Sequence, residues 1–117
     1  MAGTTIDELL NGARARLERV DVHAAQAALD DGALLVDIRS ESQRARDGVV
    51  PGSVFIPRNV LEWRVDQLRA APRVIVMCDE GYQSSLAAAT LRDLGLAATD
   101  LAGGFQAWRE AGLPVEL

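Results

Sequence analysis

Apolar residues recur along the chain with two spacings, which predict alternating strands and helices. Four short runs, at residues 33–38, 53–56, 73–77 and 98–101, are almost continuously apolar, as is typical of strands buried on both faces of a parallel sheet. Two later stretches, at residues 84–94 and 105–111, have apolar positions at helical spacing, and a glycine follows each of them. The alternation favours an α/β fold in which helices cover both faces of a mainly parallel sheet.

The first thirty residues carry two helix-start signals. Thr5 and Glu8 have the spacing of a capping box, which opens a predicted helix that runs to about Arg19. Asp21 is placed to cap a second helix over residues 22–29. We therefore expect residues 1–20 to form an N-terminal helical extension and residues 21–117 to form a single domain.

Composition agrees with one soluble globular domain. The chain has 117 residues, of which 49% are hydrophobic and 25% are charged. Aromatic residues make up only 4%, so the core is expected to be mainly aliphatic, with Trp63 and Trp108 packed in the body of the domain. The net charge of −5 disfavours binding to nucleic acid or to an anionic membrane.

Several functional classes are disfavoured by what the sequence lacks. The first residues do not have the basic start and apolar run of a secretion signal, and no apolar stretch is long enough to span a bilayer. We therefore expect a cytoplasmic protein. One cysteine cannot form an internal disulfide, and a single histidine gives no metal-ligand cluster of recognisable spacing. Neither a metal nor a cofactor is expected.

The single cysteine, Cys78, follows the predicted strand 73–77 and precedes the predicted helix that begins at Ser84. Parallel sheets bind ligands at this end of their strands. Backbone N–H groups of the loop and of the first helical turn lack intrahelical partners and can stabilise a thiolate or persulfide anion. Gly81 permits a backbone conformation that a ring of inward N–H groups commonly needs. The alternative is that Cys78 is simply a small buried apolar residue, and the loop alone does not decide between the two.

Four separated motifs, in the right order, resemble those of the rhodanese homology domain. Leu35-Val36-Asp37-Ile38-Arg39 resembles the family's Val-Asp-x-Arg strand. Residues 48–57 resemble its Gly-His-Ile-Pro-Gly-Ala segment, residues 78–84 stand at its catalytic loop, and residues 101–108 resemble its closing Gly-Gly-x-x-x-Trp. The resemblance extends from about Asp21 to Leu117, and we interpret residues 21–117 as a rhodanese-like domain.

The resemblance implies a three-layer sandwich with a central, mainly parallel sheet of five strands and helices on both faces. It also implies that Cys78 takes sulfane sulfur from a small donor as a persulfide and passes it to a thiol or another nucleophile. A protein is one candidate acceptor, and no cofactor is required. The loop residues expected to bind the substrate are Asp79, Glu80, Gly81, Tyr82, Gln83 and Ser84.

Three features of the sequence depart from the family pattern. The family's loop often reads Cys-x-x-Gly-x-Arg, and here Gln83 replaces the arginine that would pair with an anionic donor. Asp79 and Glu80 place two carboxylates beside the thiol, which opposes thiolate formation and repels thiosulfate. Val49 replaces the histidine of the Pro-Gly segment. Thiosulfate is therefore expected to be a poor donor.

Other charged residues follow the strands that lead to the predicted site. Asp37 and Arg39 end the first core strand, and we expect them to brace neighbouring loops rather than to react. Arg58 and Arg64 follow the next strand. They are candidates to replace the missing loop arginine, and the alternative is that they are solvated or form surface salt bridges.

Two further functions compete with sulfur transfer. A noncatalytic rhodanese-type module that binds a partner would keep the fold, with Cys78 as a remnant. A protein phosphatase or arsenate reductase of the related fold would need a loop one residue longer that ends in arginine. Neither Gln83 nor Ser84 can supply that guanidinium, so the sequence disfavours this third function.

Overall fold

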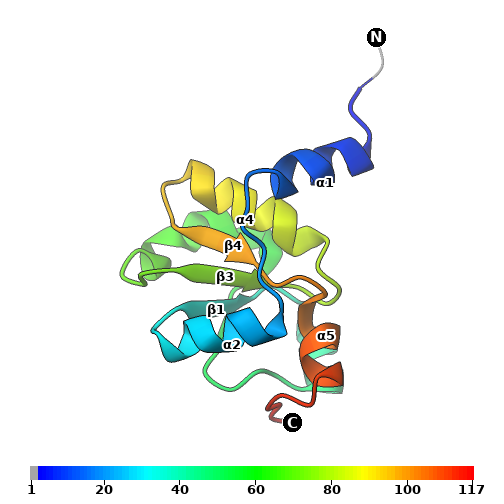
Figure 1. Ribbon diagram of the computed structural model, residues 1–117, viewed down its shortest axis with the longest axis vertical. Helices are drawn as coiled ribbons and strands as arrows, with labels where there is room; N and C mark the ends of the chain where they lie inside the picture. The colour runs from blue at the N-terminus through cyan, green and yellow to red at the C-terminus, as the bar shows by residue number, and fades with distance from the viewer. Residues whose placement is uncertain (1–2) are drawn as a thin grey trace.

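A parallel sheet with helices packed around it forms the centre of the computed structural model, which describes residues 3–117 (Figure 1). The order of its strands across the sheet is β2-β1-β3-β4, and all neighbouring pairs are parallel. The strands are β1 (Leu34–Asp37), β2 (Val54–Phe55), β3 (Val74–Met77) and β4 (Ala98–Asp100). The helices are α1 (Ile6–Arg14), α2 (Val22–Asp30), α3 (Glu41–Asp47), α4 (Gln83–Asp93) and α5 (Gly104–Glu110), with a 3-10 segment η1 (Arg58–Leu68).

The predicted fold class is confirmed, but the number of strands differs. Five strands were expected, and residues 3–117 form a sheet of four. Val20 takes the next position beyond β4 through a single parallel bridge to Leu101. Its N–H donates to the carbonyl of Asp100 at 3.1 Å, and its own carbonyl accepts from the N–H of Ala102 at 2.8 Å. Asp21 then caps α2, so the chain leaves the sheet edge after one paired residue.

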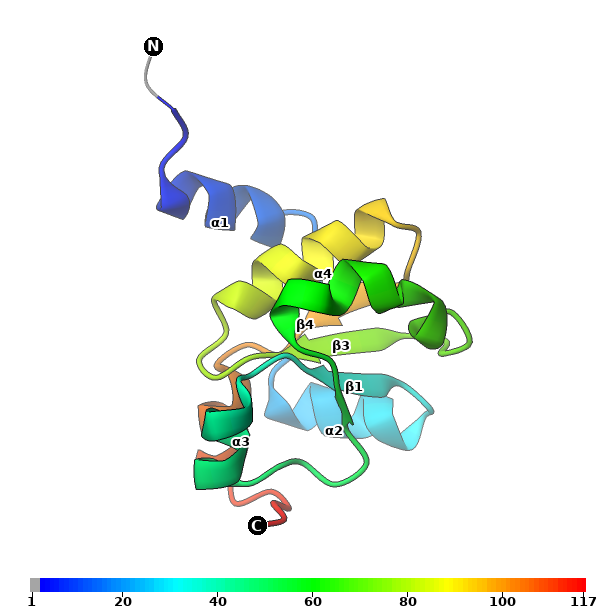
Figure 2. The same cartoon turned by 180° about the vertical axis from the view of Figure 1, so that it is seen from behind.

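β1, β3 and β4 bury side chains on both of their faces, because successive side chains point to opposite sides of a sheet, whereas the edge strand β2 is only half-buried. One core lies beneath α4 and η1 and contains Val36, Val74, Val76, Leu61, Leu68 and Leu91. The other lies against α2 and α5 and contains Leu35, Ile75, Met77, Ala25, Phe105 and Trp108. Figure 2 shows α4 on one side of the sheet and α2 on the other, which is the expected layered arrangement.

The N-terminal helix is shorter than the sequence predicts. Thr5 and Glu8 form the expected capping box, and Asp21 caps α2 by accepting from the N–H of Ala24. However, α1 ends at Arg14 instead of Arg19, because the chain makes a turn there and then extends to pair Val20 with the sheet. The helix packs on α4, and its buried residue is Ala13 (Figures 1 and 2).

Two helical segments were not predicted, and one tryptophan lies where it was not expected. Ser40 and Gln43 form a capping box that opens α3, but this helix has no buried residue, so apolar spacing could not reveal it. The segment η1 has 3-10 geometry, which the helical spacing rule does not describe. Trp63 on η1 is 82% exposed, whereas Trp108 is buried and its Nε1–H donates to the carbonyl of Pro114. Within residues 3–117 no helix has the length and apolar character needed to cross a bilayer.

Candidate active site

The sulfur of Cys78 lies within a loop of converging backbone amides. The loop links β3 to α4 and includes residues 78–82. Cys78 is only 7% exposed, and its Sγ accepts from the N–H of Gly81 at 3.1 Å and from the N–H of Ser84 at 3.3 Å. Gly81 has a φ of +95°, a conformation that other residues rarely adopt. Two N–H donors aimed at one sulfur can stabilise negative charge that develops on it during a reaction.

The start of α5 holds the outer backbone of this loop. The N–H of Phe105 donates to the carbonyl of Cys78 at 2.9 Å, and the N–H of Gln106 donates to that of Asp79 at 3.1 Å. A Cβ at Gly104 would lie 2.6 Å from both carbonyl oxygens. Residues 103–104, interpreted from the sequence as tight-turn geometry, thus allow α5 to approach the loop closely.

A buried carboxylate anchors the first turn of α4. Asp100, at the end of β4, is fully buried and accepts hydrogen bonds at Oδ2 from the hydroxyls of Ser84 and Ser85, both at 2.8 Å. Arg19 donates to the same carboxylate through Nε at 3.0 Å and Nη2 at 3.1 Å. Neither Asp100 nor Arg19 was predicted from the sequence to lie at the site. The signal for Asp100 was a charge at the end of a buried strand, next to the strand that carries Cys78.

A cavity of about 320 Å³ opens beside the sulfur. Its lining includes Ile38, Arg39, Gln43, Arg58, Cys78, Asp79, Glu80, Tyr82 and Gln83. Most of the predicted site residues therefore meet around one cavity, with Gln43 as an addition. Gly81 and Ser84 reach the sulfur through their amides. Arg64 is exposed and does not line the cavity.

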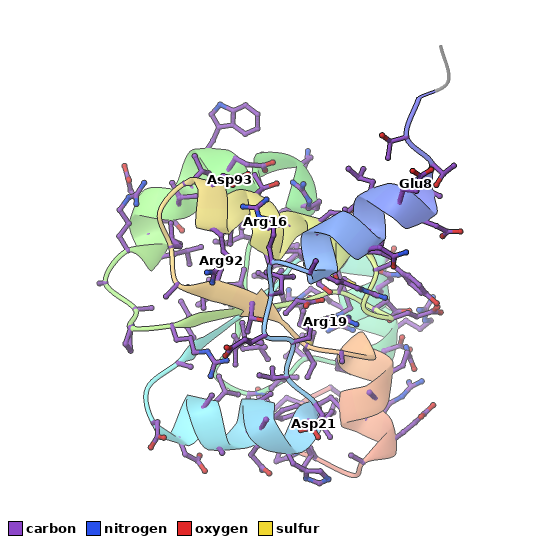
Figure 3. The ribbon with its side chains drawn as sticks, turned by 45° about the horizontal axis from the view of Figure 1, so that its top comes forward. Glu8, Arg16, Arg19, Asp21, Arg92 and Asp93 are labelled. Carbon is purple, nitrogen blue, oxygen red and sulfur yellow. The ribbon has the colours of Figure 1, made fainter. Side chains whose placement is uncertain are left out.

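A larger cavity, of about 620 Å³, lies away from the cysteine. It is at the beginning of β3 and β4, at the end of the strands opposite Cys78, and Arg16 and Arg92 line it (Figure 3). Its lining contains no thiol. We therefore assign the candidate chemistry to the smaller cavity. Within the described part of the chain, no three His, Cys, Asp or Glu side chains come close enough together to hold a metal ion.

Asp37 and Arg39 form a buried ion pair behind the cavity. Nε and Nη2 of Arg39 donate to the two oxygens of Asp37 at 3.1 and 2.9 Å, and Nη2 also donates to the carbonyl of Gly48 at 2.8 Å. The guanidinium lies 3.8 Å from the centre of the Phe105 ring. Nη1 of Arg39 is buried and has no hydrogen-bond partner among residues 3–117. The pair links β1 to the loop before β2 and to α5.

The charged groups around the cavity are mostly engaged with other side chains. Arg58 donates through Nη1 to both oxygens of Glu62, at 2.8 and 3.0 Å, while its buried Nε has no partner in the described chain. Asp79 accepts from the side-chain amide of Gln106 at 2.9 Å, and Glu80 is exposed.

The carboxylate of Asp79 also acts on Arg46. The pKa of the Arg46 guanidinium is raised, chiefly by its hydrogen bond to Asp47 and to a smaller extent by the charge of Asp79. The same hydrogen bond lowers the pKa of Asp47. Asp79 therefore accepts a hydrogen bond from Gln106 and acts on Arg46 through its charge, although it belongs to the cysteine loop.

Comparison with known proteins identifies a family and several proteins to which this chain is similar. A family model for the rhodanese-like domain matches residues 21–111. A sulfurtransferase of Allochromatium vinosum is 32% identical over 83 residues, which cover 70% of this chain and 77% of that protein. The thiosulfate sulfurtransferase GlpE of Vibrio cholerae is 33% identical over 99 residues, which cover 83% of this chain and 92% of that protein.

Among solved structures, a protein of Rhodopseudomonas palustris matches with a TM-score of 0.88 and 29% identity. The match covers 99% of this chain and 97% of that one. That protein is described as being of unknown function and a possible tyrosine phosphatase. The similarity therefore extends through the N-terminal helix, beyond the residues that the family model matches.

Proposed function

The chain belongs to the rhodanese-like domain family, and from this we propose that it is a sulfurtransferase in which Cys78 carries sulfane sulfur as a persulfide. The observation that carries the proposal is the pair of backbone N–H groups aimed at the Cys78 sulfur beside an open cavity. The relatives from Allochromatium vinosum and Vibrio cholerae, which are named sulfurtransferases, support the same reaction class.

The proposed reaction has two displacement steps at sulfur. The Cys78 thiolate attacks the outer sulfur of a donor, the S–S bond of the donor breaks, and the leaving group departs with the bonding electrons. The amides of Gly81 and Ser84 are placed to stabilise the anion before and after this step. An acceptor thiolate then attacks the terminal sulfur of the persulfide and releases Cys78 as a thiolate. Because Cys78 is the only cysteine in the sequence, the acceptor thiol belongs to another molecule, either a small thiol or a protein.

We propose that the donor is a persulfide or polysulfide rather than thiosulfate. Both arginines of the cavity are ion-paired, Arg39 with Asp37 and Arg58 with Glu62. The cavity also contains Asp79 and Glu80, and Gln83 adds no charge. A dianion such as thiosulfate would therefore meet two carboxylates without a free guanidinium in the loop.

Phosphatase chemistry is less well supported, although the similar protein of Rhodopseudomonas palustris is described as a possible phosphatase. A phosphate ester requires a cation that grips the phosphoryl oxygens at the end of the loop. Here Gln83 and Ser84 stand at those positions.

A noncatalytic binding module differs from the proposed enzyme in one measurable property, because it would not accept sulfur at Cys78.

The decisive experiment is mass spectrometry of the intact protein after exposure to inorganic polysulfide. Wild type is expected to gain sulfur, to lose it again when a reducing thiol is added, and to be labelled at Cys78. Cys78→Ser is the matched control and is expected to gain none. Equal labelling of the two proteins would overturn the proposal, and no labelling of either would favour the noncatalytic module.

A further inference from the structure

The N-terminal segment outside the family-matched residues 21–111 reaches the cysteine loop. Arg14, the last residue of α1, donates through Nη2 to the carbonyl of Gly81 at 2.8 Å. Arg19, in the extended segment that follows, donates through its own Nη2 to the same carbonyl at 2.9 Å. One carbonyl oxygen has two lone pairs, and two guanidinium groups occupy this one.

This carbonyl belongs to the residue whose N–H faces the sulfur. The N–H of Gly81 donates to Cys78 Sγ, while its C=O is held from outside the loop by the two arginines. The N–H lies in the peptide plane before the Gly81 Cα and the carbonyl in the plane after it, so holding the carbonyl limits the changes in φ and ψ of Gly81 that would turn the N–H away from the sulfur. The constraint matters at Gly81 in particular, because glycine has more accessible backbone conformations than any other residue.

Arg14 also contacts Tyr82, the last residue of the loop, and Ser85 in the first turn of α4. Its Nε donates to the hydroxyl of Ser85 at 3.0 Å, and its guanidinium lies 5.7 Å from the centre of the Tyr82 ring. Ser85 in turn donates to Asp100, the carboxylate that Arg19 binds. The two arginines thus join α1, the segment before α2, the cysteine loop, the first turn of α4 and the end of β4 in one network.

The two arginines differ in charge balance. Arg19 is paired with Asp100, so its charge is compensated within the network. Among residues 3–117 no carboxylate lies within salt-bridge distance of the half-buried Arg14. An uncompensated cation next to the loop attracts anionic reagents toward the sulfur.

We propose that Arg14 and Arg19 are positioning residues for the cysteine loop, so that α1 and the segment after it are part of the active site. The role rests on the proposed function, since it concerns the reactivity of Cys78. Arg14 holds the Gly81 carbonyl and supplies positive charge next to the loop. Arg19 acts through Asp100 and the same carbonyl.

The test is the alkylation rate of Cys78 in Arg14 variants, measured with neutral iodoacetamide and anionic iodoacetate. Arg14→Met keeps the apolar stem and removes the charge and donors. We expect alkylation by iodoacetate to be about tenfold slower, because a hydrogen bond to a charged group stabilises by the equivalent of roughly one factor of ten. Alkylation by iodoacetamide, which does not sense the lost charge directly, should slow less.

Two further variants separate positioning from general stability. Arg16→Met is the matched control, because Arg16 lies two residues further on, pairs with Asp93 and makes no contact with the loop. It should alkylate at the wild-type rate. Arg14→Lys retains the charge and its donors, and the Gly81 carbonyl and Ser85 hydroxyl oxygens lie 3.4 Å apart, within reach of one ammonium group, so we expect it to recover most of the rate. Far-ultraviolet circular dichroism and thermal melting report whether each variant folds.

The outcomes separate this role from the proposed function. If Arg14→Met alkylates within twofold of wild type with both reagents, or if the Arg16→Met control slows equally, the positioning role is wrong. Should Arg14→Met fail to fold, Arg14→Ala, which removes the charge and the donors and is a good helix former, decides, and a wild-type rate in that variant overturns the role. If wild type gains no sulfur from polysulfide while alkylation still depends on Arg14, the proposed function fails and the positioning role stands.

Discussion

The sulfur of Cys78 is contacted by two backbone N–H groups, whereas the charged side chains around it are engaged with other groups. Asp79 accepts from Gln106, and Arg58 is paired with Glu62. The immediate environment of the sulfur is therefore set by the peptide backbone. The side chains that line the cavity determine which donor can approach.

At the residue scale, Gln83→Arg is expected to raise kcat/KM in the thiosulfate:cyanide assay by about tenfold. Each close like charge costs a dianion on the order of 1 kcal/mol in a partly solvated site, and a guanidinium offsets this cost. Neutralising Asp79 and Glu80 to Asn and Gln should raise the value further. The measurement is made at fixed ionic strength, with Arg58→Ala and Arg64→Ala alongside.

These two arginine variants test whether η1, rather than the cysteine loop, binds the donor. Arg64 lies outside the cavity, so Arg64→Ala should resemble wild type. Efficient wild-type turnover of thiosulfate that is unaffected by Gln83→Arg but collapses in Arg58→Ala would mean that η1 binds the donor. That result would contradict the expectation that the charges of the loop exclude thiosulfate.

Gly104→Ala is expected to destabilise the fold by about 3 kcal/mol, since it adds both overpacking and backbone strain. The new Cβ would lie 2.6 Å from the carbonyl oxygens of Cys78 and Asp79, and φ at this position is +60°. Gly112→Ala is the matched control, because φ there is +75° but no atom of residues 3–117, apart from its chain neighbours, lies within 4 Å of the new Cβ. It should cost only about 1 kcal/mol. Urea unfolding measures both values, and equal losses would show that contact with the cysteine loop is unimportant.

At the scale of elements, β3, the cysteine loop and α4 form one continuous unit that other elements hold from two sides. The start of α5 donates to the carbonyls of Cys78 and Asp79. The end of β4 supplies Asp100, which binds Ser84 and Ser85 in the first turn of α4. The position of α4 relative to the sheet therefore depends on a polar network as well as on its apolar face.

Asp100→Asn tests this polar network. The substitution leaves Arg19 without its ion-pair partner and disturbs two serine hydroxyls, so we expect a loss of about 3 kcal/mol in the free energy of unfolding. Asp66→Asn is the control, because Asp66 forms an exposed pair with Arg69 and should change stability by less than about 0.5 kcal/mol. Denaturant titrations of the two variants give the comparison. Similar losses would show that the buried network contributes no more than a surface pair.

At the scale of the whole molecule, the sheet separates two apolar cores, and α1 lies outside both of them on α4 (Figure 2). The molecule has a net charge of −5, so an anionic donor meets repulsion from the protein as a whole as well as from Asp79 and Glu80. Salt screens this long-range repulsion more than it weakens the contacts within the cavity.

Added salt is therefore expected to raise kcat/KM of the wild type for thiosulfate modestly, by about twofold between low and physiological ionic strength. Screening weakens the repulsion of a dianion more than that of a less charged persulfide, which serves as the comparison donor. Initial rates over a sodium chloride series measure the effect. A rate that falls with salt would indicate that the cavity attracts anions, contrary to the charge argument.

Local patterns in the sequence were sufficient to predict much of this protein. The four apolar runs, the capping residues Thr5 and Asp21, and the place of Cys78 between a strand and a helix all depend on neighbours within a few residues. Such features are determined by side-chain periodicity and by local hydrogen bonding, and both can be recognised from residues that are close in sequence. They were enough for the fold class and for the cysteine loop.

Only the tertiary structure decided which distant groups meet at that loop. Arg14 and Arg19 are 67 and 62 residues away from Gly81 in sequence, and Gln106 is 27 residues away from Asp79. Arg58 lines the cavity because it begins η1, whereas Arg64 lies further along that segment and is exposed. These contacts depend on how α1, α5 and η1 pack around the sheet. Local spacing rules do not predict that packing, because it results from the burial of apolar faces contributed by the whole chain.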